Sequence, residues 1–272
     1  MNIAIISSSK DLAGVNIRNN LIEIFNFEGI DEKFDSNNVY EYNKIKNKNI
    51  KSYLINSDLI HAENIDKKIE ADVFIFASKH KSKENTPSFT VHPIGNWDKA
   101  EFGGEERKLC LSSAVLLKNL FIKLNKNGNK NYEISMEATH HGPYISKPAV
   151  FVEIGSTEKE WSDKSNGEII AKTIISTLNQ DNKYKIAVGI GGTHYCTNFN
   201  KIVLSTDIAL SHICPKYHLD KLNEGLLQQS IEKTKEKADF ILLDWKGLGT
   251  EKQRILNLLK NINLEFKRGD QV

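Results

Sequence analysis

The sequence has few of the features that mark secreted or membrane proteins. Its 272 residues include only three cysteines, Cys110, Cys196 and Cys214, an odd number at wide spacing that argues against a disulfide framework. No window holds the ~18 apolar residues that a membrane-spanning helix needs. The first residues, MNIAIISSSKD, resemble a buried strand and turn rather than a signal peptide. We therefore expect a cytoplasmic protein in a reducing setting, with no membrane contact.

An excess of charge of one sign is also missing. Lys and Arg total 37 and Asp and Glu total 35, so the formal net charge is only +2. This balance argues against a histone-like nucleic-acid binder, although a local basic stripe is still compatible with it. With 39% hydrophobic and 26% charged residues, the chain is expected to be globular. We find no internal repeat and no Pro/Ser-rich linker, and we expect a single domain over residues 1–272.

Strand-like and helix-like segments alternate along the chain. The expected strands are short apolar runs rich in β-branched residues, at 2–7, 52–56, 73–78, 132–137, 149–155, 185–191 and 239–244. Asp11 is expected to cap the first helix, over LAGVNIRNNLIEIF. Further helices are expected over 106–124, 168–178, 220–237 and 251–259. This alternation predicts an α/β fold with a sheet covered on both faces.

Two segments do not follow this pattern. The polar, Asn- and Lys-rich stretch 31–50 is expected to be peripheral, with at most a poor edge strand. The stretch 79–105 has no clear periodicity, and it contains His80, His92 and Asn96. Loops this long inside a compact domain are usually functional or disordered. Its density of glycine, proline and ring side chains favours an ordered functional loop.

Histidine placement is the most informative feature of the sequence. Six of the eight histidines lie at or just after strand-like runs: His80, His92, His140, His141, His194 and His212. Ligand sites of open α/β sheets form at the carboxyl ends of strands, so these residues are expected to converge. Imidazoles together with a carboxylate such as Glu137 suit Zn²⁺. For any one histidine a capping or solvated role is an equal alternative, but all six being incidental is a much poorer explanation.

The neighbours His140 and His141 pose a particular question, because adjacent side chains cannot project to the same side of a strand. We expect them to serve different roles or to lie in a turn. The segment GIGGTHYC matches no phosphate-binding loop, and its Gly191, Gly192 and Thr193 N–H groups could stabilise an oxyanion. An ordinary strand-to-helix turn is the alternative.

Other polar residues carry weaker indications. Asn96 could hold a substrate carbonyl or a ribose hydroxyl, but an ordinary turn is the better interpretation. Cys196 and Cys214 each follow a histidine by two residues, which would suit a thiol nucleophile or metal ligand, although cysteine is more often a small buried hydrophobe. The lysines around His80, including Lys79, could contact a polyanion, whereas solvated faces explain most lysines taken singly.

Taken together, several blocks resemble one family. SKHKS (78–82), TVHPIGNW (90–97), AEFGGEE (100–106), EATHHGP (137–143), VEIGSTEKEW (152–161), GIGGTHY (189–195) and SHICPKY (211–217) are similar in order and spacing to the archaeal and plant type of D-aminoacyl-tRNA deacylase. Each block alone is unspecific, but their combination is specific. The resemblance covers about residues 74–217 and is weaker at the start and near LLDWKGL.

The resemblance implies a monomeric, zinc-dependent hydrolase with up to two Zn²⁺ ions per subunit. Such an enzyme cleaves the ester of D-aminoacyl-tRNA, releases a free D-amino acid, and thereby proofreads chirality in translation. Its partner would be the acceptor end of a tRNA that carries a D-amino acid. The implied fold is a three-layer α/β/α domain around a mixed sheet, of the phosphorylase and peptidyl-tRNA hydrolase kind.

Roles for individual residues are then expected as follows. Zn²⁺ would be held by His92, His140, His141, His194 and His212. Catalysis would involve Glu137, Glu153, His140 and His194, with a carboxylate as general base. The substrate would contact His80, Lys79, Asn96, Gly191, Gly192 and Thr193.

Two other functions use the same residues. A zinc amidase or peptidase on a related scaffold would need the histidines but not the lysines. A non-catalytic tRNA-binding protein with a structural metal would bind RNA without turnover, and the near-neutral charge predicts weak, salt-sensitive binding for it.

Overall fold

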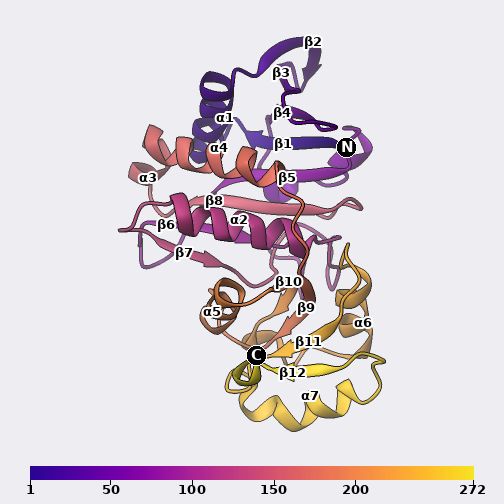
Figure 1. Cartoon of the computed structure of the whole chain (residues 1–272). Helices are drawn as coiled ribbons and strands as arrows, with labels where there is room; N and C mark the ends of the chain where they lie inside the picture. The colour runs from indigo at the N-terminus through magenta and orange to yellow at the C-terminus, as the bar shows by residue number, and fades with distance from the viewer.

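Two β-sheets organise the chain, whose computed structural model describes all 272 residues (Figure 1). The larger sheet has eight strands in the order β2-β3-β4-β1-β5-β8-β6-β7. Its central strands β4, β1, β5 and β8 are parallel, whereas β6 runs antiparallel to β8. The strand bounds are β1 (Asn2–Ser8), β2 (Glu28–Phe34), β3 (Asn37–Tyr42), β4 (Asn49–Ile55), β5 (Val73–His80), β6 (Ser88–His92), β7 (Glu133–Met136) and β8 (Ala149–Gly155).

The smaller sheet has four parallel strands in the order β10-β9-β11-β12. They are β9 (Lys185–Ile190), β10 (Ile208–Cys214), β11 (Phe240–Leu243) and β12 (Phe266–Arg268). The helices are α1 (Leu12–Phe25), α2 (Ala114–Asn127), α3 (Glu158–Ser162), α4 (Lys164–Leu178), α5 (Thr197–Ser205), α6 (Glu224–Glu232) and α7 (Lys252–Leu259). None of them is both long and apolar enough to cross a membrane.

Both faces of the larger sheet are buried, as strand β1 shows. Ile3 and Ile5 belong to the core beneath α1, α2 and α4, whereas Ala4 and Ile6 belong to a second core on the opposite face. The second core is closed by short 3-10 turns, such as the one that contains Leu59, and by loops. Figure 1 shows α1, α4 and α2 side by side along the sheet. This double burial explains why the strands are continuous apolar runs rather than alternating ones.

Helix α2 connects the two sheets. It packs on β6 and β7 of the larger sheet and also on β10 of the smaller one. Leu117 and Leu120 of α2 share one apolar core with residues of both sheets. The smaller sheet is covered by α5 on this side and by α6 and α7 on the other. The two sheets therefore meet at one junction. Strands of each sheet have their carboxyl ends beside it.

The α/β fold with a mixed sheet is confirmed. All seven expected strands are present, and Asp11 caps α1 by accepting a hydrogen bond from Gly14 N at 3.0 Å. The helix expected over 106–124 begins only at Ala114, because Ser113 caps it by accepting from Leu116 N. The helix expected over 220–237 is shorter. Helix α6 begins at Glu224, because Asn223 caps it, and it ends at Glu232.

Sequence analysis missed strands in both unusual segments. The stretch 31–50 contains β3 and parts of β2 and β4, and β2 forms the edge of the sheet. The stretch 79–105 contains β6, whose five residues are all buried between β8 and β7. Strand β10 and helix α5 were also not expected. Short strands of this kind are stabilised by pairing with distant strands, which local periodicity does not reveal.

Lys118 offers a test of the junction between the sheets. This α2 lysine is 1% exposed, and its Nζ donates to Thr206 O at 2.5 Å and to Ile208 O at 2.9 Å, at the start of β10. Burial lowers its pKa to about 8. Lys118→Met retains the apolar stem but leaves both carbonyls without this donor, so we expect the free energy of unfolding to fall by about 1–3 kcal/mol. Urea denaturation measures it, with the exposed Lys126→Met as the control; equal stability of the two variants would contradict this role.

Candidate metal centre and active site

The site begins where strands of the larger sheet end. His80 and His92 are the last residues of β5 and β6, and Glu137 directly follows β7. The parallel pairing of β6 with β7 places Glu137 beside His92, and Glu137 N donates to Val91 O at 3.0 Å. Glu153 lies in β8, between β5 and β6, opposite Thr90. Strand pairing therefore brings His80, His92 and Glu137 together, as their positions after strand-like runs predicted, and Glu153 joins them from within β8.

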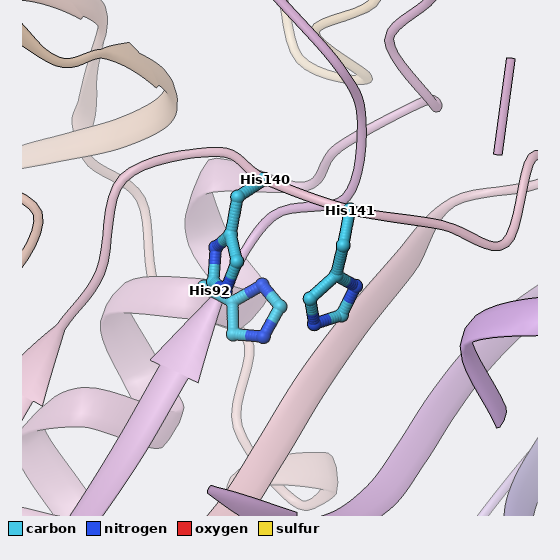
Figure 2. Close-up of side chains that lie close together, drawn as sticks. All are labelled: His92, His140 and His141. Carbon is cyan, nitrogen blue, oxygen red and sulfur yellow. The ribbon is translucent and has the colours of Figure 1, made fainter. Parts of the chain in front are cut away.

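His140 and His141 join this group from the segment after β7. Figure 2 shows both side chains descending from one stretch of chain towards His92. The ring centroid of His92 is 4.0 Å from that of His140 and 4.8 Å from that of His141. Adjacent residues reach the same place because His141 has a φ of +43°, outside the strand region. The expected turn is therefore present.

Hydrogen bonds to the backbone orient these three rings. The Nδ1 of His92 lies 3.1 Å from Pro93 O, that of His140 2.8 Å from Ala138 O, and that of His141 2.6 Å from Gly142 O. Because a carbonyl can only accept, each Nδ1 carries the proton and donates it. A neutral ring in this tautomer keeps the lone pair of Nε2 free, which is the usual arrangement of a metal-binding histidine.

The two carboxylates lie deeper than these three rings. Glu137 is 0% exposed, and neither of its oxygens has a hydrogen-bond donor. Its nearest polar neighbours are His80 Nδ1 at 3.2 Å and the Nε2 atoms of His140 and His194, each at 3.6 Å. Glu153 accepts from Thr90 Oγ1 at 3.1 Å and lies 3.5 Å from His80 Nδ1. A buried carboxylate without donors is costly, so this site favours a cation.

The pKa shifts of the histidines also show that positive charge is favoured next to Glu137 and Glu153. Burial would lower the pKa of His80, but its hydrogen bond to Glu153 and the charges of Glu137 and Glu153 raise it to about 9. Burial and the neighbouring histidines instead lower the pKa of His140 and bring that of His141 to about 3. His140 and His141 are therefore neutral at pH 7, and their nitrogens are available as ligands. Burial would also lower the pKa of His92, but its interaction with Glu153 raises it.

Three overlapping groups of side chains could each hold a metal ion, because their ligand atoms lie within 4.8 Å of one another. They are His92 with His140 and His141; Glu137 with His140 and His194; and His80 with Glu137 and Glu153. Nitrogen and carboxylate ligands in sets of three suit Zn²⁺. Four of the five expected zinc ligands, His92, His140, His141 and His194, are in these groups. His80, which we expected at the substrate, is in one of them as well.

The smaller sheet contributes His194, which follows β9. Its backbone oxygen accepts from Ala138 N at 2.8 Å, which joins the loops of the two sheets. Its Nδ1 lies 3.0 Å from the hydroxyl of Tyr217, and the hydroxyl of Tyr195 lies 3.2 Å from His80 Nε2. Sequence analysis did not single out these tyrosines, although they lie in the quoted blocks GIGGTHY and SHICPKY, next to or near histidines.

Two expected residues have other partners. His212 lies in β10 and is not part of the cluster; its Nε2 is 3.0 Å from Cys110 O and its Nδ1 is 3.2 Å from Thr139 Oγ1. Both ring nitrogens are thus occupied, which leaves none for a metal. Asn96 donates from Nδ2 to Gly103 O at 2.9 Å and to Glu105 O at 3.2 Å, so its amide group holds the loop together.

Lys79 is exposed, with its Nζ 5.7 Å from the centre of the Trp161 ring. Cys196 and Cys214 are both buried, and burial raises the pKa of each thiol. Neither cysteine is therefore suited to form the thiolate that nucleophilic catalysis needs.

The glycine loop after β9 keeps donors free. Gly191 and Gly192 have φ values of +100° and +83°, which favour glycine. Gly191 N donates to Cys214 O at 2.8 Å, whereas the N–H groups of Gly192 and Thr193 have no acceptor in the chain. Gly192 is buried with its N beside Gly247, whereas Thr193 is exposed, so the Thr193 N–H next to His194 could bind a substrate oxygen.

Comparison with known proteins agrees with this arrangement. A chain described as a D-aminoacyl-tRNA deacylase from Thermococcus onnurineus is 38% identical over 97% of this chain and 98% of its own. Proteins described in the same way from Pyrococcus furiosus and Methanosarcina mazei are 37% and 35% identical, over 96% and 99% of this chain and 98% and 93% of their own.

A solved structure also matches the whole fold. The crystal structure of a conserved protein of unknown function is 32% identical, has a TM-score of 0.89, and covers 100% of this chain and 96% of its own. A sequence profile described as D-aminoacyl-tRNA deacylase matches residues 67–267, which include every histidine of the cluster. The resemblance found in the sequence is thereby confirmed, and the chain belongs to the D-aminoacyl-tRNA deacylase family.

Proposed function

We propose that this protein hydrolyses the ester bond between a D-amino acid and tRNA, using zinc held by the histidine–carboxylate cluster. Family membership supports the reaction. The observation that supports the metal is Glu137, a fully buried carboxylate with no hydrogen-bond donor, surrounded by imidazole nitrogens at 3.2–3.6 Å. Burying such a charge without compensation costs several kcal/mol, which a bound cation offsets.

The residues fit zinc in number and kind. His92, His140 and His141 would hold one ion through their Nε2 atoms, because each Nδ1 is engaged with a backbone carbonyl. His80, Glu137 and Glu153 would hold a second ion. The orphan Nε2 of His92 supports the first assignment, since it is buried without a hydrogen-bond partner. When bound, zinc lowers the pKa of a coordinated water to ~7 and polarises an ester carbonyl.

The remaining residues would handle the substrate and its protons. The side chain of His194 is 31% exposed, compared with 25% for that of His140. Tyr217 contacts its Nδ1, so Nε2 can exchange a proton with the leaving ribose oxygen. The free N–H group of Thr193 would donate to the carbonyl oxygen as it gains negative charge. Lys79 and neighbouring lysines would meet tRNA phosphates.

The proposed reaction predicts that replacing the Glu137 carboxylate with an amide lowers the rate of ester hydrolysis. Glu137→Gln keeps the size of the side chain but removes its charge, so kcat/KM for D-tyrosyl-tRNA should fall by about 10²–10⁴-fold. Release of tyrosine from D- and L-tyrosyl-tRNA with zinc present measures this, and only the D-ester should be turned over. Glu28→Gln, on the exposed edge strand β2, is the matched control. Hydrolysis by the wild type no faster than in buffer would refute the proposed reaction.

The same assay separates the two other functions. Cleavage of peptides that added tRNA does not affect would favour an amidase, and RNA binding without turnover would favour a tRNA-binding protein. Under the proposed function the cluster is needed for turnover rather than for RNA binding, so His140→Ala should abolish the first and retain the second.

Metal content tests the ligand assignment without an activity assay. We expect elemental analysis to find zinc in the wild type and about half as much in His92→Ala and His141→Ala, since each loses one of the three ligands of the first ion and keeps those of the second. His61→Ala removes an exposed histidine outside the cluster and should retain all the zinc. Full zinc occupancy in the cluster variants would place the metal elsewhere.

A further inference from the structure

The free edge of β7 faces the start of α5, where the two sheets meet. Strand β7 is the last strand of the larger sheet, so it pairs only with β6. Figure 1 shows α5 next to β10 and near the end of β7, and the helix contacts both strands. The backbone N–H groups on the unpaired side of β7 therefore need acceptors from outside the larger sheet.

Two of these N–H groups, on either side of Glu137, find acceptors in the segment that follows β9. Met136 N donates to Oδ1 of Asn200 in α5 at 3.2 Å, and Ala138 N donates to His194 O at 2.8 Å. The first acceptor is a side chain, whereas the second belongs to the backbone. A single substitution can therefore remove the first contact and leave the second in place.

The Asn200 side chain also holds the loop that carries His194. Its Nδ2 donates to Tyr195 O at 2.9 Å, while its Oδ1 accepts from Met136 N. Met136 directly precedes Glu137, and Tyr195 directly follows His194. Asn200 is 9% exposed, so this one amide joins the backbone next to Glu137 to the backbone next to His194 inside the protein.

The loop needs such an anchor because its own backbone is permissive. Gly191 and Gly192 precede His194 at φ values of +100° and +83°, and glycine adopts many other conformations at little cost. The bond from Ala138 N holds the loop at one carbonyl, and the bond from Asn200 fixes the next carbonyl along the chain. Two successive fixed carbonyls define how the peptide between them is oriented.

We propose that Asn200 is a positioning residue that holds the His194 imidazole against Glu137, where His194 Nε2 lies 3.6 Å from Glu137 Oε2. Its role in turnover rests on the proposed function, in which His194 exchanges a proton with the leaving oxygen. Asn200 lies behind the loop, and it acts through His194 rather than on the substrate. The distance between the two sheets at the reacting groups is thereby set by one side chain of α5.

Kinetics test this role with two variants. Asn200→Ala removes both bonds and should lower kcat for D-tyrosyl-tRNA about 10–100-fold, as for a reacting group displaced by about 1 Å, with KM unchanged. Asn200→Asp retains an acceptor for Met136 N but loses the donor to Tyr195 O, so the edge of β7 stays anchored and kcat should still fall. Asn20→Ala, which removes a buried asparagine of α1, is the control and should retain kcat.

A double-mutant cycle separates positioning from a general loss of structure. In a His194→Ala background, Asn200→Ala should cause no further loss of kcat, because the side chain that it positions is absent. Additive losses, with an active wild type, would overturn the positioning role and leave the deacylase in place.

Nuclear magnetic resonance of the histidine rings tests the geometry without catalysis. In ¹H–¹⁵N spectra, Asn200→Ala should shift the ring signals of His194, which are assigned from His194→Ala, and leave those of the exposed His61 unchanged. Asn200→Asp gives the same readout if Asn200→Ala does not fold. Unshifted His194 signals overturn the proposal. An inactive wild type whose His194 signals shift in the Asn200 variants refutes the deacylase and supports the positioning of His194.

Discussion

The buried charge of Glu137 is the constraint on which the rest of the site depends. Its carboxylate has no donor and no exposure, and the imidazoles of His80, His140 and His194 approach it from both sheets. A charge in this position is tolerated only if positive charge is supplied. In the protein alone, the raised pKa of His80 supplies part of it, and the remaining lone pairs on the outer histidines are arranged for a cation.

The two sheets meet at the Glu137 carboxylate. The larger sheet supplies Glu137 and four histidines at or after the ends of β5, β6 and β7, and it supplies Glu153 from within β8. The smaller sheet supplies His194. The bond from Ala138 N to His194 O ties the two loops, and Lys118 ties α2 to the start of β10. Chemistry at the junction thus relies on contacts that lie well outside the cluster.

Much of this arrangement could be predicted from local sequence. Apolar runs indicated seven of the strands, and the Asp11 cap indicated the start of α1. The features that could not be predicted depend on backbone conformation and tertiary contacts. The φ of His141 turns its ring towards His92, and nothing in a His-His pair specifies that angle. His212 follows the same strand pattern as the others, but its strand directs it to Cys110 and Thr139, and a single sequence does not show which face of a strand meets which loop.

The central claim is that the Nε2 atoms of His92, His140 and His141 share one zinc ion. Anomalous diffraction from crystals grown with zinc, recorded on both sides of the zinc absorption edge, tests it most directly. We expect an edge-dependent peak about 2.0–2.1 Å from each of these three nitrogens. A zinc peak bound only at other residues, with the three rings unliganded, would contradict it.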